Sequence, residues 1–231
     1  MFLELAEVLD CPDCRASAGL VAFVDRAEAR RVIEGRLGCP LCEIEVPIRL
    51  GTMRFDLSGA ARRASPAEQP EDLAPAAPPS GPAAEAGLRI AALLGVTDRA
   101  GAVVLLGPAL AAHAARLARM GDRLEVLAWL DDTRGGDASS IEELAAGVNP
   151  LLGAAPDGWP IRSGSLHGIA LAGPLGLAGA PALALTEIER CARPGARLLV
   201  HGPTPEDLEC LSNAGFAELA ADETAWVGER R

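Results

Sequence analysis

The sequence predicts an α/β protein in which a small β-rich segment precedes a larger domain built around a mostly parallel sheet. Four cysteines in two CPxC pairs mark the first part. From about Ala83 onward, segments with the apolar spacing of strands and of helices alternate along the chain. Two strand-like segments close together at the C-terminal end predict an antiparallel hairpin at one edge of the sheet.

Composition limits the classes of partner. The 231 residues, 49% of them hydrophobic, suffice for one small and one medium domain, each with a buried core. The formal net charge is −11, and every basic residue other than histidine is an arginine. Because cationic side chains drive binding to phosphate backbones, nucleic acid is disfavoured as a partner.

The N-terminal segment favours a cytoplasmic protein. Glu4 and Glu7 stand where a secretion signal needs positive charge. The weakly polar stretch from Gly168 to Leu185 contains four glycines and two prolines, so we expect no membrane helix there. In a reducing compartment, clustered cysteines indicate metal binding before disulfides, whereas Cys191 and Cys210 stand apart and are expected to be buried thiols.

Residues 1–58 are predicted to form the first domain. Its expected strands are Leu20–Val24, Arg31–Leu37 and Ile44–Ile48. In the last of these, Ile44, Val46 and Ile48 alternate with outward-facing residues, which is the period of a half-buried strand.

Cys11, Cys14, Cys39 and Cys42 are predicted to bind one structural zinc ion. Two residues separate the cysteines of each pair, and 24 residues separate the pairs. This spacing lets four thiolates surround one tetrahedral metal, and it leaves no open position for water or substrate. The alternatives are an iron–sulfur centre or two redox dithiols. Neither pair lies at the strand-to-helix turn that a thioredoxin-type dithiol occupies.

Residues 59–83 are predicted to be a linker. Six prolines fall between Pro66 and Pro82, among Ala, Ser and Glu. Such a composition cannot bury a core and tends toward extended conformations.

Residues 84–231 are predicted to form the second domain. The expected strands are Ala102–Leu106, Leu124–Leu130, Gly168–Ala172, Arg197–His201, Phe216–Ala220 and Thr224–Gly228. The expected helices are Ala84–Leu94, Ala109–Met120, Ile141–Val148, Pro181–Ala192 and a last one from Thr204 to near Gly215. This alternation predicts a mostly parallel sheet covered on both faces.

Two of these helices have start signals. Ser140 and Glu143 have the spacing of a capping box ahead of the helix expected to end at Val148. Thr204 is the expected N-cap of the last helix, with Pro205 at its first position.

The first domain resembles known zinc ribbons. LDCPDC followed by LGCPLCEIEVPIRLGTMRF is similar to the short zinc-ribbon proteins that activate RNA and release-factor methyltransferases, and to the ribbon of certain rRNA guanine methyltransferases. The similarity covers about 50 residues. It implies a module that faces RNA or protein, and the excess of acidic residues favours a protein partner.

The second domain resembles class I S-adenosylmethionine-dependent methyltransferases. Three segments carry the resemblance, and they cover nearly all of residues 84–231 in the family's order: VVLLGPALAAHAARLARM, WPIRSGSLHGIALAG, and LTEIERCARPGARLLVHGP followed by LSNAGF. The resemblance implies a Rossmann-like, methyltransferase-type fold. S-adenosylmethionine is the cofactor that it implies.

The cofactor positions of that family are only partly kept. The resemblance implies that Gly107 and Asp131, or its neighbour Asp132, bind the cofactor. Ala109 and Ala111 stand where later glycines let the backbone approach the cofactor. Leu105 stands where that family usually has an acidic residue, and His167 stands where it usually has an aspartate. Ala196 replaces a glycine of the family's Pro-Gly-Gly turn.

The remaining polar candidates have structural interpretations. His167, His113 and His201 are expected to be structural, and Trp159 either lines a pocket or closes the sheet edge. The sequence contains no pattern of a nucleophile with a base, of paired catalytic carboxylates or of a phosphate loop, so no catalytic residue is assigned.

The sequence therefore predicts a zinc-ribbon protein with a methyltransferase-like domain whose cofactor site has degenerated, and which binds a protein partner as a scaffold or regulatory component. One alternative is an active S-adenosylmethionine-dependent methyltransferase on a small molecule, a protein or RNA. The other is a domain that binds a different small ligand through Trp159 and His167. Fold similarity alone does not establish activity.

Overall fold

A computed structural model describes residues 1–15, 18–28, 31–55, 82–96, 101–120, 124–130, 148–152, 158–173 and 181–231. All of the predicted linker except its last two residues lies outside these ranges, as do Asp131, Asp132, Ser140 and Glu143.

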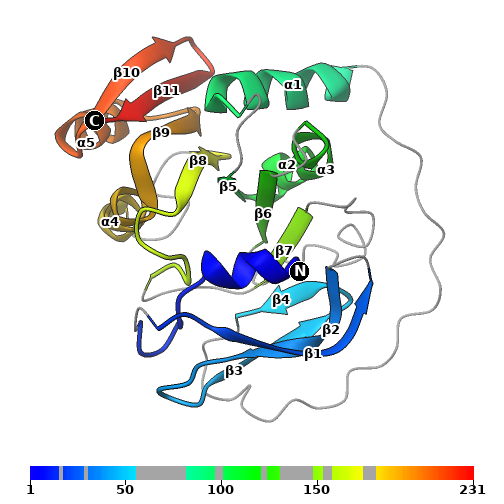
Figure 1. The fold of residues 1–231 in the computed structure, drawn as a ribbon. Helices are drawn as coiled ribbons and strands as arrows, with labels where there is room; N and C mark the ends of the chain where they lie inside the picture. The colour runs from blue at the N-terminus through cyan, green and yellow to red at the C-terminus, as the bar shows by residue number, and fades with distance from the viewer. Residues whose placement is uncertain are drawn as a thin grey trace.

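In the described part of the chain, all eleven strands form one sheet in the order β1-β2-β3-β4-β7-β6-β5-β8-β9-β11-β10 (Figure 1). The strands are β1 Val21–Glu28, β2 Arg31–Gly38, β3 Glu45–Arg49, β4 Thr52–Arg54, β5 Gly101–Leu106, β6 Leu124–Leu130, β7 Val148–Leu152, β8 Leu166–Leu171, β9 Ala192–His201, β10 Phe216–Ala221 and β11 Ala225–Arg230. The helices are the 3-10 helix η1 Leu3–Glu7 and the α-helices α1 Pro82–Leu94, α2 Pro108–Ala111, α3 Ala114–Ala118, α4 Pro181–Cys191 and α5 Pro205–Asn213.

The predicted fold class is confirmed. Strands β7, β6, β5, β8 and β9 are parallel, and β11 pairs antiparallel with both β9 and β10 to form the C-terminal hairpin. Strands β1 to β4 form an antiparallel N-terminal part. None of the helices described is long and apolar enough to cross a membrane.

The two parts of the sheet are joined by one short parallel pairing. Met53 of β4 pairs with Leu151 of β7, and Arg54 pairs with Leu152. Strands β1 to β4 therefore extend the edge of the parallel sheet.

Some predicted elements differ from those observed. The helix predicted over Ala109–Met120 is divided into α2 and α3, and at the break the His113 N–H bonds to Leu110 O in a tighter i→i+3 turn. Val148, the predicted end of a helix, instead begins β7, and the rest of that predicted helix lies outside the described residues. The sequence interpretation did not include η1, β4 or β7.

Each face of the parallel sheet has its own apolar core. On one face, Ile90 and Leu94 of α1 and Leu117 of α3 pack with Val103 and Val126 of the sheet. The other face shares its core with the N-terminal part of the chain. There the buried residues are Leu5, Leu9 and Ile48 from the N-terminal part and Val104, Leu127, Ile169 and Ile188 from the second part.

The N-terminal segment lies beside the connection between β7 and β8, which crosses the sheet. The chain runs from β7 to β8 past the intervening strands β6 and β5, and residues 158–165 of this connection contain no helix. In Figure 1, η1 lies between the ribbon strands and the parallel strands. Leu5 and Leu9, both fully buried, thus cover part of this face of the sheet.

Candidate functional site

The structure brings the four predicted metal ligands together. The Sγ atoms of Cys11 and Cys42 are 3.4 Å apart, those of Cys14 and Cys39 are 3.5 Å apart, and all four lie within 4.8 Å of one another. Four sulfurs at about 2.3 Å from one central ion would be separated by similar distances. The cluster can therefore hold a metal ion in tetrahedral coordination.

Both cysteine pairs form the same backbone turn. Arg15 and Glu43, each directly after the second cysteine of its pair, have positive φ angles of 50° and 61°. The N–H of Arg15 bonds to Cys11 O, and the N–H of Glu43 bonds to Cys39 O, both at 3.1 Å. This repeated i→i+4 turn orients the two thiols of each pair toward the same point.

The thiols of Cys11 and Cys39 differ in acidity. Burial raises the pKa of Cys11 to about 12. Burial also acts to raise the pKa of Cys39, but N–H groups of Cys42 and Leu41 that donate to its sulfur lower that pKa to about 7 overall. Because a metal binds thiolates, Cys39 is deprotonated more readily than Cys11 for a bond to the metal.

The other two cysteines have different environments. Cys191 is buried as predicted, with its Sγ 3.6 Å from Ile161 O, and burial raises its pKa to about 12. Cys210 is exposed, which corrects the sequence expectation, because it occupies a solvent-facing position of α5.

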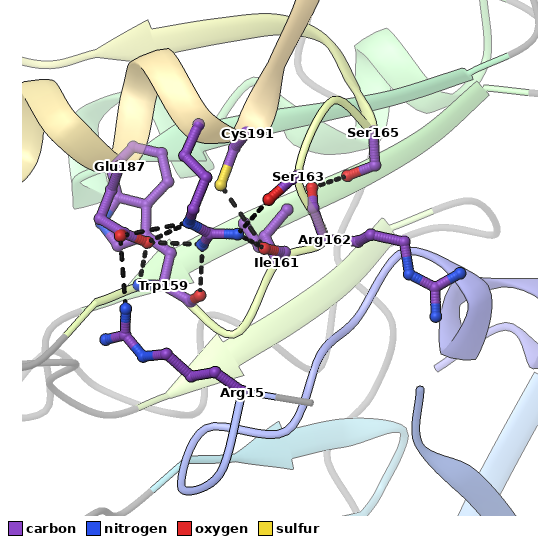
Figure 2. A network of polar contacts seen from close by, with 9 residues as sticks. Arg15, Trp159, Ile161, Arg162, Ser163, Ser165, Glu187 and Cys191 are labelled. Atoms are coloured by element: carbon purple, nitrogen blue, oxygen red, sulfur yellow. Dashed lines mark hydrogen bonds and ion pairs between the residues drawn. The ribbon is translucent and has the colours of Figure 1, made fainter. Parts of the chain in front are cut away.

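The first cysteine pair contacts the second domain through its flanking residues. Asp10, before Cys11, lies 3.3 Å from Arg162 Nε through its carboxylate. Its backbone N–H bonds to Pro160 O at 3.3 Å, and the Arg162 N–H bonds to Val8 O at 2.7 Å. Arg15, after Cys14, lies 3.5 Å from Glu187 of α4 (Figure 2).

Glu187 is the centre of a buried polar network. Its side chain is only 7% exposed and accepts hydrogen bonds from the Trp159 N–H at 2.7 Å and from Arg190 Nη2 at 2.5 Å. Burial acts to raise the pKa of Glu187, but these hydrogen bonds and the charges of Arg190 and Arg15 lower it overall. The carboxylate is therefore held ionised.

Arg190 connects the same network to the loop before β8. Its guanidinium donates to Ile161 O at 2.6 Å and to Trp159 O at 2.9 Å, so both contacts hold the loop. Trp159 is itself buried in the shared core. Sequence reasoning missed this network, because Arg15 and Glu187 lie far apart in the sequence.

The predicted cofactor residue Gly107 directly follows the carboxyl end of β5. Gly107 has a φ of +102°, and an added Cβ would lie 3.0 Å from that of Ala172. Ala172 also bonds through its N–H to Leu106 O at 3.1 Å. Leu105, at the position of the usual acid, is fully buried in the apolar core. Asp131 and Asp132 lie outside the described residues, so the structure leaves their ribose role a prediction.

The three histidines belong to different elements. His113 stands at the start of α3, and His201 ends β9, where burial lowers its pKa. His167 is the second residue of β8 and thus lies toward the amino end of the parallel strands.

No protein-family model and no curated protein matches this chain. Solved structures do. Geranyl diphosphate C-methyltransferase from Streptomyces coelicolor A3(2) is 9% identical, with a TM-score of 0.51 over 64% of this chain and 79% of that one. A SAM-dependent methyltransferase from Aquifex aeolicus is 18% identical, with a TM-score of 0.48 over 62% and 87%. The cyclase SpnF is 19% identical, with a TM-score of 0.47, and the matched region spans 59% of this chain and 58% of SpnF.

The second part of the chain therefore has the Rossmann-like fold of class I methyltransferases. The order β7-β6-β5-β8-β9-β11-β10, with one antiparallel strand inserted next to β10, is the arrangement on which this conclusion rests. The protein combines this methyltransferase-like fold with an N-terminal four-cysteine cluster that can hold a metal ion. At such identities the likeness to solved structures extends to the fold alone.

Proposed function

We propose that this protein is a zinc-stabilised, methyltransferase-like binding protein that serves a protein partner as a scaffold or regulatory component and does not transfer methyl groups efficiently. The observation that carries the proposal is the burial of Leu105. In the resembling family an acid at this position contributes to the cofactor site, whereas Leu105 is fully buried among apolar side chains of the α1 and α3 face.

The conformation of Gly107 supports the same proposal. A φ of +102° and the close approach of Ala172 require glycine at this position whether or not a cofactor binds. Ala109 and Ala111 stand where the resembling family has its later glycines. At these two positions the backbone gives no such reason for a glycine. The one glycine that is kept is thus the one that the fold itself needs.

The proposed metal is zinc with a structural role. Four thiols fill a tetrahedral set and leave no position for a reacting molecule, which is the arrangement of structural zinc sites. A reducing compartment such as the cytoplasm would keep these thiols available as ligands.

A protein partner is supported by the surface of the ribbon. The exposed large apolar residues include Val21, Phe23 and Val24 of β1 and Leu41 between the second pair of cysteines, which is 65% exposed. Exposed apolar side chains gathered on one element are typical of protein contact surfaces. The net charge of −11 disfavours nucleic acid there.

Calorimetric titration of the zinc-loaded protein with S-adenosylmethionine and with its demethylated product tests this proposal. We expect no binding up to millimolar concentrations. The double variant Ala109→Gly with Ala111→Gly tests whether these two alanines prevent cofactor binding, because it restores both glycines and leaves Gly107 unchanged. Micromolar binding by the unchanged protein would overturn the proposal.

The alternative is an active methyltransferase with a relaxed glycine turn. It is favoured by the position of Gly107, which directly follows β5 as the turn glycine does in the resembling family. If the protein is such an enzyme, Asp131→Ala abolishes methyl transfer. If it is a binding protein, this substitution changes nothing measurable in a methylation assay.

A further inference from the structure

Cys14 differs from the other cysteines of the metal cluster in its access to solvent. Cys11 and Cys39 are buried and Cys42 is half-buried, whereas Cys14 is exposed. Oxidation of a cysteine is favoured by exposure and by thiolate character, and a metal holds its cysteine ligands as thiolates. Within the loaded cluster, Cys14 is therefore the sulfur that a dissolved oxidant reaches first.

A second sulfur lies close enough to complete the oxidation. The Sγ of Cys39 is 3.5 Å from the Sγ of Cys14, and it belongs to the other cysteine pair. The S–S bond of a disulfide is about 2.0 Å long, so the two atoms need to approach by about 1.5 Å. A sulfenic acid condenses with such a neighbouring thiol to a disulfide. Cys39 is thus in place to react with an oxidised Cys14.

Arg15 connects Cys14 to the second domain. It follows Cys14 directly, and its N–H bonds to Cys11 O at 3.1 Å in a turn that holds Arg15 at a φ of 50°. From this turn the Arg15 guanidinium reaches to within 3.5 Å of the buried carboxylate of Glu187 (Figure 2). A shift of Cys14 toward Cys39 displaces the turn and with it the backbone of Arg15. A chemical change at Cys14 is therefore transmitted to Glu187.

We propose, on the basis of the structural metal proposed above, that Cys14 is a site of reversible oxidation by hydrogen peroxide. Oxidation joins Cys14 to Cys39 in a disulfide, releases the metal ion and loosens the contact between the N-terminal part and the second domain. The disulfide joins one cysteine of each pair, whereas the disulfide of a CxxC redox dithiol stays within one pair.

The reaction uses one peroxide molecule for two thiolates. The Cys14 thiolate attacks one peroxide oxygen, the O–O bond breaks, and Cys14 becomes a sulfenic acid while hydroxide leaves. The Cys39 thiolate then attacks the sulfenic sulfur, the S–O bond breaks, and a second hydroxide leaves. Each hydroxide takes a proton from the solvent. The two sulfurs thus lose two electrons, which reduce the peroxide to water.

This disulfide removes two of the four metal ligands. A disulfide sulfur carries no negative charge, so the thiolates of Cys11 and Cys42 are what remains of the set. A structural zinc site needs four ligands, and the affinity of the cluster for the ion falls as thiolates are lost. The new covalent bond keeps the two pairs connected but no longer holds all four sulfurs around one centre.

The test uses the zinc-loaded, full-length Cys210→Ser protein, which lacks the exposed cysteine outside the cluster. Elemental analysis should find one zinc ion per chain before oxidation. Hydrogen peroxide is then added at one equivalent, and a chromogenic zinc chelator follows the release of the ion. We expect loss of the zinc, a Cys14–Cys39 disulfide in the peptide map by mass spectrometry, and recovery of the zinc with dithiothreitol and added zinc.

Hydrogen exchange measures the loosened contact. The Asp10 N–H bonds to Pro160 O at 3.3 Å, and the Arg162 N–H bonds to Val8 O at 2.7 Å, so both amides lie between the N-terminal part and the second domain. Both should exchange at least about tenfold faster after oxidation, because the contact that protects them opens more often. Reduction with zinc should restore the slow exchange.

Two histidine variants separate oxidation of Cys14 from a general weakening of the cluster. Cys14→His keeps a zinc ligand but removes the oxidisable thiolate, so it should release zinc at least about tenfold more slowly than the parent protein. Cys42→His is the matched control, because it also exchanges one ligand but keeps Cys14, and it should release zinc as fast as the parent. If either variant holds no zinc, the peptide map of the parent protein decides.

Retention of zinc after peroxide treatment, or a first disulfide that does not include Cys14, would overturn the proposal. Equal rates of zinc release from Cys14→His and Cys42→His would also overturn it. If the protein held no zinc before oxidation, the structural metal would fail and the oxidation site with it. If it held zinc and kept it in peroxide, the structural metal would stand and the oxidation site alone would fail.

Discussion

Arg15 Nη1 lies 3.5 Å from Glu187 Oε1, which joins the residue after Cys14 to a carboxylate buried in the second domain (Figure 2). Gly158 makes this contact possible, because a Cβ at that position would lie 2.1 Å from Arg15 Nη2. Arg15 also needs its left-handed conformation, which belongs to the turn of the first cysteine pair. Order at the cysteine cluster is therefore linked to packing around α4.

Metal removal is the first prediction. We expect chelation to unfold residues 1–58, because a structural metal contributes on the order of 10 kcal/mol to so small a domain. Since Leu5 and Leu9 belong to the core shared with the parallel sheet, the free energy of unfolding of residues 84–231 should fall as well. Amide NMR spectra recorded before and after chelation measure both effects.

The control for metal removal uses the cysteines themselves. Cys14→Ser should lose the metal, whereas Cys210→Ser, at an exposed position away from the cluster, should retain one metal ion per chain. An unchanged ribbon amide spectrum after complete chelation would refute the structural role of the metal.

Glu187 is the subject of the second prediction. Glu187→Gln should lower the free energy of unfolding at neutral pH by about 3 kcal/mol, because it leaves the partly buried Arg190 without its carboxylate. Glu45→Gln is the matched control, since the Glu45–Arg36 pair is exposed, and it should cost under about 1 kcal/mol. Urea unfolding measures both, and equal losses would contradict the central position of Glu187.

The same carboxylate predicts a pH dependence. The pKa of folded Glu187 is below its ordinary value of 4.5, so the ionised form is favoured in the native state. Its contribution to stability is complete above the unfolded pKa and is lost as the pH falls through the lower folded pKa. Glu187→Gln should therefore lose less stability on acidification than the unchanged protein, and parallel pH curves for the two would exclude this contribution.

What the sequence predicted well was encoded locally. Thr204 Oγ1 accepts the Asp207 N–H at 3.2 Å, and Asp207 accepts the Thr204 N–H at 2.8 Å, so the predicted cap of α5 is confirmed as a capping box. The cysteine cluster was likewise readable, because two short motifs of fixed spacing specify it. Both features depend on residues a few positions apart.

What the sequence did not predict depends on distant residues. Strand β7 contains Asn149 and Pro150 and so lacks the alternation of a half-buried strand, and its pairing with β4 involves only two residue pairs. The contact of Arg15 with Glu187 joins residues far apart in the sequence. Neither leaves a periodic or spaced pattern that a single sequence would reveal.

Asn149 gives the fourth prediction. It is fully buried, accepts the Phe2 N–H at 2.8 Å and donates to Glu125 at 2.9 Å, so it fixes the N-terminal segment to the sheet. Asn149→Ala should cost about 1–3 kcal/mol, because it leaves the partly buried Phe2 N–H without its acceptor. The exposed Asn213→Ala is the control and should cost almost nothing. Faster hydrogen exchange at Phe2 would confirm the mechanism, and unchanged exchange would contradict it.

Gly107 gives the last prediction, which separates a backbone role from a cofactor role. Gly107→Ala forces a side chain to adopt a φ of +102° within 3.0 Å of the Ala172 Cβ, so we expect a loss of about 1–3 kcal/mol in the free energy of unfolding. Gly164→Ala is the matched control, because Gly164 has a φ of +65° but nothing within 4 Å of an added Cβ, and it should cost only about 1 kcal/mol. The difference between the two variants in urea unfolding isolates the contact with Ala172. If Gly107→Ala were fully stable and lost only S-adenosylmethionine binding, the glycine would be a cofactor residue and the backbone explanation would fail.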